Sequence, residues 1–109
     1  MAEYDLVIRN GRIVTVDRQL EGDVAVKDGR IVAVEPGIKG RGVREIDAGS
    51  KFVLPGGIDS HVHVEQRSGF GIMCADDFYS GTVSAAFGGT TTIIPFAAQH
   101  RGMQLRKVD

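Results

Sequence analysis

Two stretches in the first third of the chain share one pattern of apolar residues around a pair that tolerates positive φ angles. "DLVIRNGRIVTVD" spans residues 5–17 and "DVAVKDGRIVAVE" spans residues 23–35. Apolar runs on both sides of Asn-Gly or Asp-Gly predict two strands joined by a tight turn. We therefore expect two hairpins, centred on Asn10–Gly11 and on Asp28–Gly29. Two copies are typical of stacked hairpins in a small sandwich, because a solenoid would need a third.

Weaker strand patterns follow at residues 43–47 and 51–54, with Gly49–Ser50 as the predicted turn between them. No group of catalytic side chains occurs in the first fifty residues. We interpret residues 1–54 as part of a small β-sandwich domain that serves as scaffold.

After Pro55 the pattern changes from paired strands to strand, helix, strand. Asp76 or Asp77 is suited to cap a helix, since a short carboxylate accepts hydrogen bonds from the free N–H groups of the first turn. The helix is predicted to run to about Phe87 and to end at Gly88–Gly89. Its apolar face follows helical spacing and consists of Tyr79, Val83, Ala86 and Phe87.

A β-branched run over residues 90–97 follows, and its lack of alternation is typical of a strand covered on both faces. This predicts one βαβ unit with a right-handed crossover, and residues 99–108 would begin a second helix. The fold class is therefore α/β, with residues 55–109 as the start of a (β/α)₈ barrel. A doubly wound nucleotide-binding fold is disfavoured because residues 65–77 contain no glycine-rich phosphate loop.

Two histidines, His61 and His63, stand two residues apart at the end of the apolar strand after Pro55. Because strand side chains alternate between faces, Asp59, His61 and His63 share one face. Neighbouring neutral imidazoles on a rigid strand can chelate a metal ion. In isolation such a pair is commonly a chance occurrence, but here Pro-Gly-Gly precedes it and a glycine-rich loop follows. We predict a metal-binding pair at a strand end, where barrel enzymes place their chemistry.

Composition narrows the choice of partners. Thirteen Lys and Arg stand against 14 Asp and Glu, with a formal net charge of −1, so neither nucleic acid nor an anionic membrane is expected as a partner. The single cysteine, Cys74, excludes an internal disulfide and fits a reducing compartment. The chain shows no signal-peptide pattern and no long apolar run. We expect a cytoplasmic location.

The segments "LPGGIDSHVHVEQ" (54–66) and "CADDFYSGTVSAAFGGTTTIIPF" (74–96) resemble the cyclic-amide hydrolases of the amidohydrolase superfamily, most closely the dihydropyrimidinase and hydantoinase branch. The resemblance covers nearly the whole chain but only the first part of the family's proteins, which implies an N-terminal fragment that is inactive alone. For the full-length protein it implies opening of a dihydropyrimidine or hydantoin ring, and assembly into a homo-oligomer, a tetramer in this family.

The same resemblance implies two zinc ions per active site, one of them held by His61 and His63. The family's bridging carboxylated lysine, two further histidines and catalytic aspartate would lie beyond Asp109, so no catalytic residue is assigned in this chain. Zinc lowers the pKa of bound water to about 7 and so supplies hydroxide to attack a carbonyl. Structural and catalytic zinc sites have at least three protein ligands as a rule, so two histidines alone should bind weakly.

Alternative functions stay open beside this one. Dihydropyrimidinase-related neuronal scaffolds lack the metal ligands and act through assembly, whereas both histidines are present here and favour an enzyme. Allantoinases resemble the same segments more distantly. Dihydroorotases carry an arginine for the substrate carboxylate where this chain has Glu65, which disfavours a carboxylated ring.

Four further side chains allow a functional and a plain interpretation. Asp59 could orient the ring of His61, as carboxylates commonly do for metal-bound imidazoles, or be an ordinary strand-end carboxylate. We expect the carboxylate of Glu65 to be solvated, and His100 to be a solvated loop histidine rather than part of a barrel mouth. Cys74 has no nearby histidine in the sequence, so no nucleophile is proposed.

Overall fold

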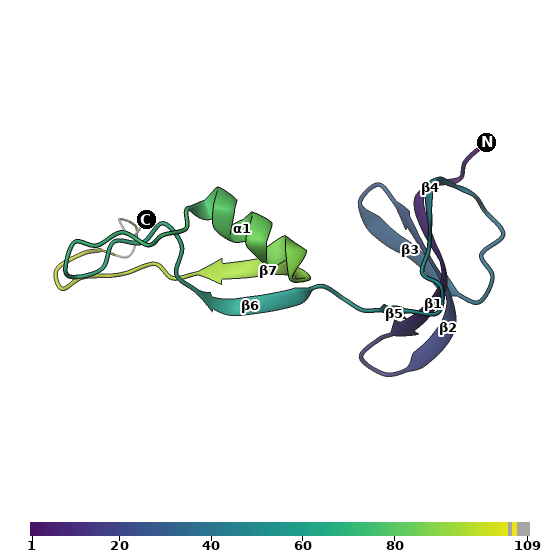
Figure 1. The fold of residues 1–109 in the computed structure, drawn as a ribbon, viewed down its shortest axis with the longest axis horizontal. Coiled ribbons are helices and arrows are strands. Elements are labelled where there is room, and N and C mark those ends of the chain that lie inside the picture. The colour runs from purple at the N-terminus through teal and green to yellow at the C-terminus, as the bar shows by residue number, and fades with distance from the viewer. Residues whose placement is uncertain (105, 107–109) are drawn as a thin grey trace. The chain divides into compact units, whose positions relative to one another are not determined.

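The computed structural model describes residues 1–104 and residue 106. The chain divides into two compact units, Met1–Pro55 and Gly56–Asp109. In the part that is described, the first unit contains strands and connecting loops, and the second contains a strand, a helix and a strand in chain order, with the helix beside the two paired strands (Figure 1).

The first unit is a single mixed sheet. Its strands are β1 (Tyr4–Val14), β2 (Gln19–Lys27), β3 (Arg30–Glu35), β4 (Gly42–Asp47) and β5 (Phe52–Val53). The strand order is β3-β2-β1-β4, and β5 also pairs with β1. Both β1–β2 and β2–β3 are antiparallel, whereas β4 and β5 run parallel to β1. The expectation of two hairpins stacked on each other is therefore wrong within this chain, because all five strands share one sheet.

The hairpin at Asp28–Gly29 is confirmed. Both residues have left-handed backbone angles, with φ of 51° and 70°. Lys27 pairs with Arg30 directly beside the turn. Two consecutive positive φ angles are the requirement of the tight turn that matches strand twist, and Asp-Gly meets it cheaply.

The hairpin predicted at Asn10–Gly11 does not form, since β1 runs straight through this pair. Asn10 has a positive φ of 55°, but this angle occurs in a bulge in the pairing of β1 with β2 rather than in a turn. The N–H of Asn10 donates to Asp23 at 2.9 Å, and its carbonyl accepts from the N–H of Ser50 at 2.8 Å. These distant partners hold the bulge in place, and the chain reverses instead after Val14.

The strands β4 and β5 do not pair with each other. They follow one another along β1, opposite Arg9 and Arg12. Gly49 and Ser50, with φ of 54° and 61°, form the expected turn. This turn connects β4 to β5, which both run parallel to β1, and it lies beside the bulge at Asn10.

The core of the first unit is small and is supported by a buried ionic group. Val7, Ala25 and Ile38 form the buried cluster, and Tyr4 and Ala33 pack against it. Burying a few aliphatic side chains contributes only a few kcal/mol. Polar contacts beside the cluster must therefore fix the loop that carries Ile38.

Asp23 provides those contacts. Its side chain is 7% exposed and accepts from Arg9 Nη1 at 3.1 Å and from the N–H of Ile38 at 3.0 Å, in addition to Asn10. Arg9 also donates to the carbonyl oxygens of Ile38 and Gly40. These groups lie on β1, on β2 and on the loop between β3 and β4, so one carboxylate and one guanidinium tie the loop to the sheet. A buried charge is tolerated when it is paired and hydrogen-bonded in this way.

Glu45 extends the network at the surface. Its carboxylate accepts from Arg9 Nη2 at 3.0 Å and from the N–H of Gly42 at 3.0 Å. The hydrogen bond from Arg9 holds the pKa of Glu45 below its usual value. A carboxyl group with a lowered folded-state pKa stabilises the fold above its unfolded pKa, and this contribution is lost as pH falls through the folded pKa.

The second unit is a βαβ unit, as predicted. It consists of β6 (Gly57–Val62), α1 (Phe78–Phe87) and β7 (Thr90–Pro95). β6 and β7 are parallel neighbours, and α1 lies along β7 (Figure 1). The parallel pairing confirms the strand, helix, strand interpretation and places the ends of β6 and β7 side by side.

The predicted signals at both ends of the helix are confirmed. Asp77 is the N-cap and accepts from the N–H of Ser80 at 2.7 Å, while Ser80 Oγ accepts from the N–H of Asp77. This reciprocal pair is a capping box. The N–H of Ser80 lowers the pKa of Asp77, so its capping contribution is lost as pH falls through that pKa. Gly88 ends the helix, and Gly89 follows with φ of 85°.

The predicted apolar face of the helix is its exposed side. Tyr79 is 79% exposed and Phe87 is 91% exposed, whereas Gly81 and Ala85 are half-buried. Gly81 packs closely against Val64, since a Cβ added at Gly81 would lie 2.7 Å from Val64 Cγ1. The half-buried side of α1 thus contains small residues, Gly81 and Ala85, rather than the large apolar side chains.

We predict that Gly81→Ala destabilises the second unit although alanine is the better helix former. The propensity gain is about 1 kcal/mol, whereas overpacking against Val64 costs about 1–3 kcal/mol. Thermal unfolding followed by helical circular dichroism measures the difference. The double variant Gly81→Ala/Val64→Ala should recover part of the loss. A stabilised Gly81→Ala variant would contradict the close packing.

Two expectations for the end of the chain are not met. Ile94 of β7 is 54% exposed, so in the described part of the chain this strand is not covered on both faces. Residues 99–104 form a turn rather than a helix, with the N–H of Met103 donating to the carbonyl of His100 at 3.0 Å. Most of the remaining positions of the predicted second helix lie outside the described residues. Among the described residues, no helix is long and apolar enough to cross a membrane.

Candidate metal centre

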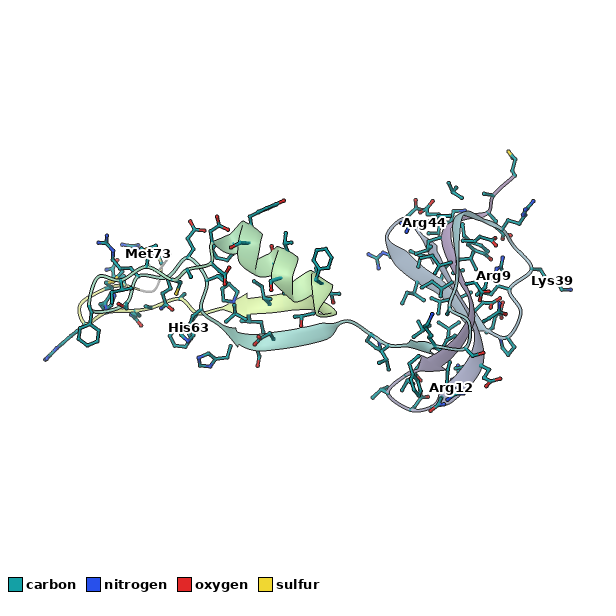
Figure 2. All side chains as sticks on the ribbon, viewed as in Figure 1. Arg9, Arg12, Lys39, Arg44, His63 and Met73 are labelled. Carbon is teal, nitrogen blue, oxygen red and sulfur yellow. The ribbon has the colours of Figure 1, made fainter. Side chains whose placement is uncertain are left out.

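The two histidines singled out in the sequence converge at the end of β6. His61 is near the end of the strand, and His63, which is labelled in Figure 2, directly follows its last residue, Val62. Their Nε2 atoms are 2.9 Å apart, and their ring centroids are 4.9 Å apart. Strand alternation therefore brings both imidazoles to one place, as predicted.

Phe96, just past the end of β7, packs against both imidazoles. Its ring centroid lies 5.2 Å from that of His61 and 5.0 Å from that of His63. The N–H of Phe96 donates to the carbonyl of Val62 at 2.8 Å, which fixes the aromatic ring beside the pair. Aromatic contacts at this distance are favourable, so Phe96 restricts the positions of the two rings.

The two imidazoles are placed so that they could supply part of the ligand set of a metal site. Two nitrogen ligands of a tetrahedral zinc ion, each at about 2.0–2.1 Å, are separated by about 3.3 Å, which is close to the observed separation of the Nε2 atoms. Within the described residues, no group of three or more His, Cys, Asp or Glu side chains is placed to hold an ion. The pair can therefore contribute two ligands, and a complete site needs others.

Two side chains near the pair make contacts that bear on the rings and on the strand end. The carboxylate of Asp59 accepts from the backbone N–H of His61 at 3.1 Å, so in this structure it supports the strand end rather than the imidazole. An orienting role toward the ring of His61 stays a prediction. His63 Nδ1 instead contacts Gln66 Oε1, a residue to which the sequence analysis gave no role.

Glu65 is exposed, as expected for a solvated carboxylate, and its side chain also makes a local contact. It has a positive φ of 50°, and its Oε2 accepts from the N–H of Phe78 at 3.3 Å. Its backbone N–H donates to the carbonyl of Asp76 at 2.8 Å. Glu65 thus places a negative charge at the positive end of α1 and ties the segment after the histidines to the start of the helix.

A cavity of about 490 Å³ opens at the ends of β6 and β7, and it is lined by residues that contact the pair rather than by the two histidines themselves. Gln66 and Phe96 line it together with Glu65, Arg67 and His100. His100 is exposed in a loop, as expected, and it also borders this cavity. Cys74 is half-buried and contacts the carbonyl of Gln66 through its N–H, which is a structural contact.

Comparison with known proteins gives consistent matches. No family model matches the chain. The chain is 48% identical to the D-hydantoinase of Rhizobium radiobacter over 103 residues, which cover 94% of this chain and 22% of that protein. It is 46% identical to the dihydropyrimidinase of Rattus norvegicus over 105 residues, which cover 92% of this chain and 20% of that protein.

Solved structures similar to this chain are also hydantoinases. The crystal structure of the D-hydantoinase from Bacillus sp. AR9 superposes with a TM-score of 0.85 and 42% identity, over 93% of this chain and 22% of that one. The chain is a homologue of part of the hydantoinases and dihydropyrimidinases. The resemblance found in "LPGGIDSHVHVEQ" and "CADDFYSGTVSAAFGGTTTIIPF" is thereby confirmed. The chain spans about a fifth of the length of these hydantoinase relatives.

Gln66 and Phe96 are the two residues at the histidine pair that sequence reasoning missed. Gln66 ends the first segment that carried the resemblance, and Phe96 ends the second. Neither residue type signals metal chemistry. The only signal was position, since residues just beyond the ends of adjacent parallel strands meet at one edge.

Proposed function

We propose that a longer protein containing this sequence hydrolyses cyclic amides, by opening a dihydropyrimidine or hydantoin ring. The convergence of His61 and His63 Nε2 atoms at a parallel strand end carries the proposal, together with similarity to proteins named D-hydantoinase and dihydropyrimidinase. In this proposal the βαβ unit begins a (β/α)₈ barrel, and the assembled enzyme is a cytoplasmic homo-oligomer, a tetramer.

The residues of this chain would hold one of two zinc ions through His61 and His63. When bound, zinc supplies a hydroxide at neutral pH and polarises the ring carbonyl. Phe96 restricts both imidazoles, and Glu65 joins the following segment to α1. The cavity at the ends of β6 and β7, which Gln66 and Phe96 line, gives space for part of a small ring. The other ligands and the catalytic aspartate are proposed to lie in the remainder of the longer protein.

Removing the metal tests this function. We expect the longer protein to open dihydrouracil or hydantoin, to fall to background after dialysis against a chelator, and to recover when zinc is added, because hydroxide formation at neutral pH depends on the ion. Ring opening is measured as loss of ultraviolet absorbance or by chromatography of the product. The 109-residue chain should stay at background in all three conditions. Full turnover by a protein shown to be free of metal would contradict the proposal.

Two alternatives are separated by the same assay. Allantoin serves as a third substrate, and exclusive turnover of allantoin would identify an allantoinase-type hydrolase. A scaffold related to dihydropyrimidinases would show no turnover and no bound metal. The presence of both histidines with converging Nε2 atoms favours the enzyme.

A further inference from the structure

Gln66 approaches the ring of His63 from the side opposite His61. Its Oε1 is in hydrogen-bond contact with His63 Nδ1, while His63 Nε2 faces His61 Nε2 at 2.9 Å. Gln66 is half-buried, and its backbone carbonyl accepts from the N–H of Cys74 at 2.9 Å. The pairing of Arg67 with Met73 closes the same loop. The amide is thus presented by an anchored segment.

The atoms in contact determine which nitrogen of His63 carries its proton. A carboxamide oxygen can only accept a hydrogen bond, so the contact requires an N–H at His63 Nδ1. In a neutral ring the other nitrogen, Nε2, then has a free lone pair. Metal coordination needs such an unprotonated nitrogen. The lone pair of His63 points to the place where the ring of His61 also converges.

We propose that Gln66 is a positioning residue that holds His63 as the Nδ1–H tautomer and so presents Nε2 for the metal. The inference rests on the proposed function only in naming a metal as the eventual partner of Nε2. Carbonyl and carboxylate groups commonly fix metal-binding histidines in this manner. Here the group is the amide of a residue three positions along the chain.

The two histidines consequently play different parts before metal binds. With the proton of His63 on Nδ1, the close Nε2–Nε2 contact requires the hydrogen from His61, which is therefore the Nε2–H tautomer. Among the described residues, no side-chain acceptor contacts Nδ1 of His61. His63 is ready for coordination, whereas His61 must lose its proton from Nε2 when an ion binds.

Nitrogen NMR of the 109-residue chain, labelled with ¹⁵N in its histidines, tests the tautomers directly at a pH where both rings are neutral. We expect His63 to show a protonated Nδ1 and His61 a protonated Nε2. Adding zinc should move the proton of His61 and leave that of His63 on Nδ1. Gln66→Leu should return His63 to the Nε2–H form that predominates for histidine in water, while Gln66→Glu, which keeps an acceptor, should retain Nδ1–H.

Zinc titration gives a second measurement on the same variants. Loss of a group that orients a metal ligand costs about 10–100-fold in affinity, so Gln66→Leu should weaken zinc binding by about that factor relative to the unmodified chain. Gln66→Glu should restore it. Gln99→Leu is the matched control, because it removes a glutamine whose amide donates to the carbonyl of Met103 and should leave both tautomers and affinity unchanged.

A protonated Nε2 on His63 in the unmodified chain would overturn the proposal. So would Gln66→Leu with the same tautomer and zinc affinity as Gln99→Leu. These results are independent of ring hydrolysis. If the longer protein fails to open cyclic amides, the proposed function fails, but NMR still decides whether His63 is the Nδ1–H tautomer and whether this depends on Gln66.

Discussion

Replacing His61 or His63 by alanine in the longer protein should lower bound metal and ring hydrolysis together. Removing a partner that merely orients a ligand costs about 10–100-fold in metal affinity, so losing a ligand should cost about 100-fold or more. The Nε2 atoms of the two rings converge, and among the described residues no third ligand group lies beside them. Metal analysis and a ring-opening assay on dihydrouracil and hydantoin measure both effects.

Glu65→Ala is the control for metal content. Its carboxylate contacts the N–H of Phe78 rather than either imidazole, so the variant should keep its metal while weakening the start of α1. In the 109-residue chain, neither histidine substitution should change activity, which begins at background. Full metal content and full turnover in the longer protein carrying both histidine substitutions would refute the assignment of His61 and His63 as ligands.

Replacing Asp23 by alanine should destabilise the first unit by about 3 kcal/mol, because one partner of a buried ion pair is removed and the other stays. The substitution leaves Arg9 Nη1 and the N–H groups of Asn10 and Ile38 without their acceptor. Hydrogen exchange at Val7 and Ala25, both fully buried, reports on this unit separately from the second one.

Glu45→Ala is the matched control for Asp23→Ala. It removes the other carboxylate that contacts Arg9. The side chain of Glu45 is 39% exposed, and exposed ion pairs contribute little to stability. Asp23→Asn, which keeps an oxygen acceptor but not the charge, should fall between the two. Equal exchange rates in Asp23→Ala and Glu45→Ala would show that burial does not distinguish the two carboxylates.

Features that depend on contacts within a few residues were predictable. The turn at Asp28–Gly29, the cap at Asp77 and the helix end at Gly88–Gly89 each follow from one residue type meeting a local backbone requirement. The pairing of His61 with His63 is of the same kind. Strand alternation over two residues is enough to put both rings on one face.

Other features were decided by residues distant in the chain. Asn10–Gly11 has the same turn chemistry as Asp28–Gly29, yet it forms a bulge because Asp23 and Ser50 satisfy the backbone of Asn10. The periodicity of α1 marked Tyr79 and Phe87, but the helix turns Gly81 toward Val64. Propensity and periodicity describe what a segment can do, and packing selects among those choices.

The candidate site combines both kinds of information. The chain order of residues was sufficient for the histidine pair and for the parallel strands that carry it, because strand geometry repeats every two residues. The contacts of Gln66 with His63, and of Phe96 with both rings, were not predictable. They depend on how the loop after β6 folds back and on the adjacency of β6 and β7, and these arrangements are fixed by long-range packing and hydrogen bonds rather than by residue type.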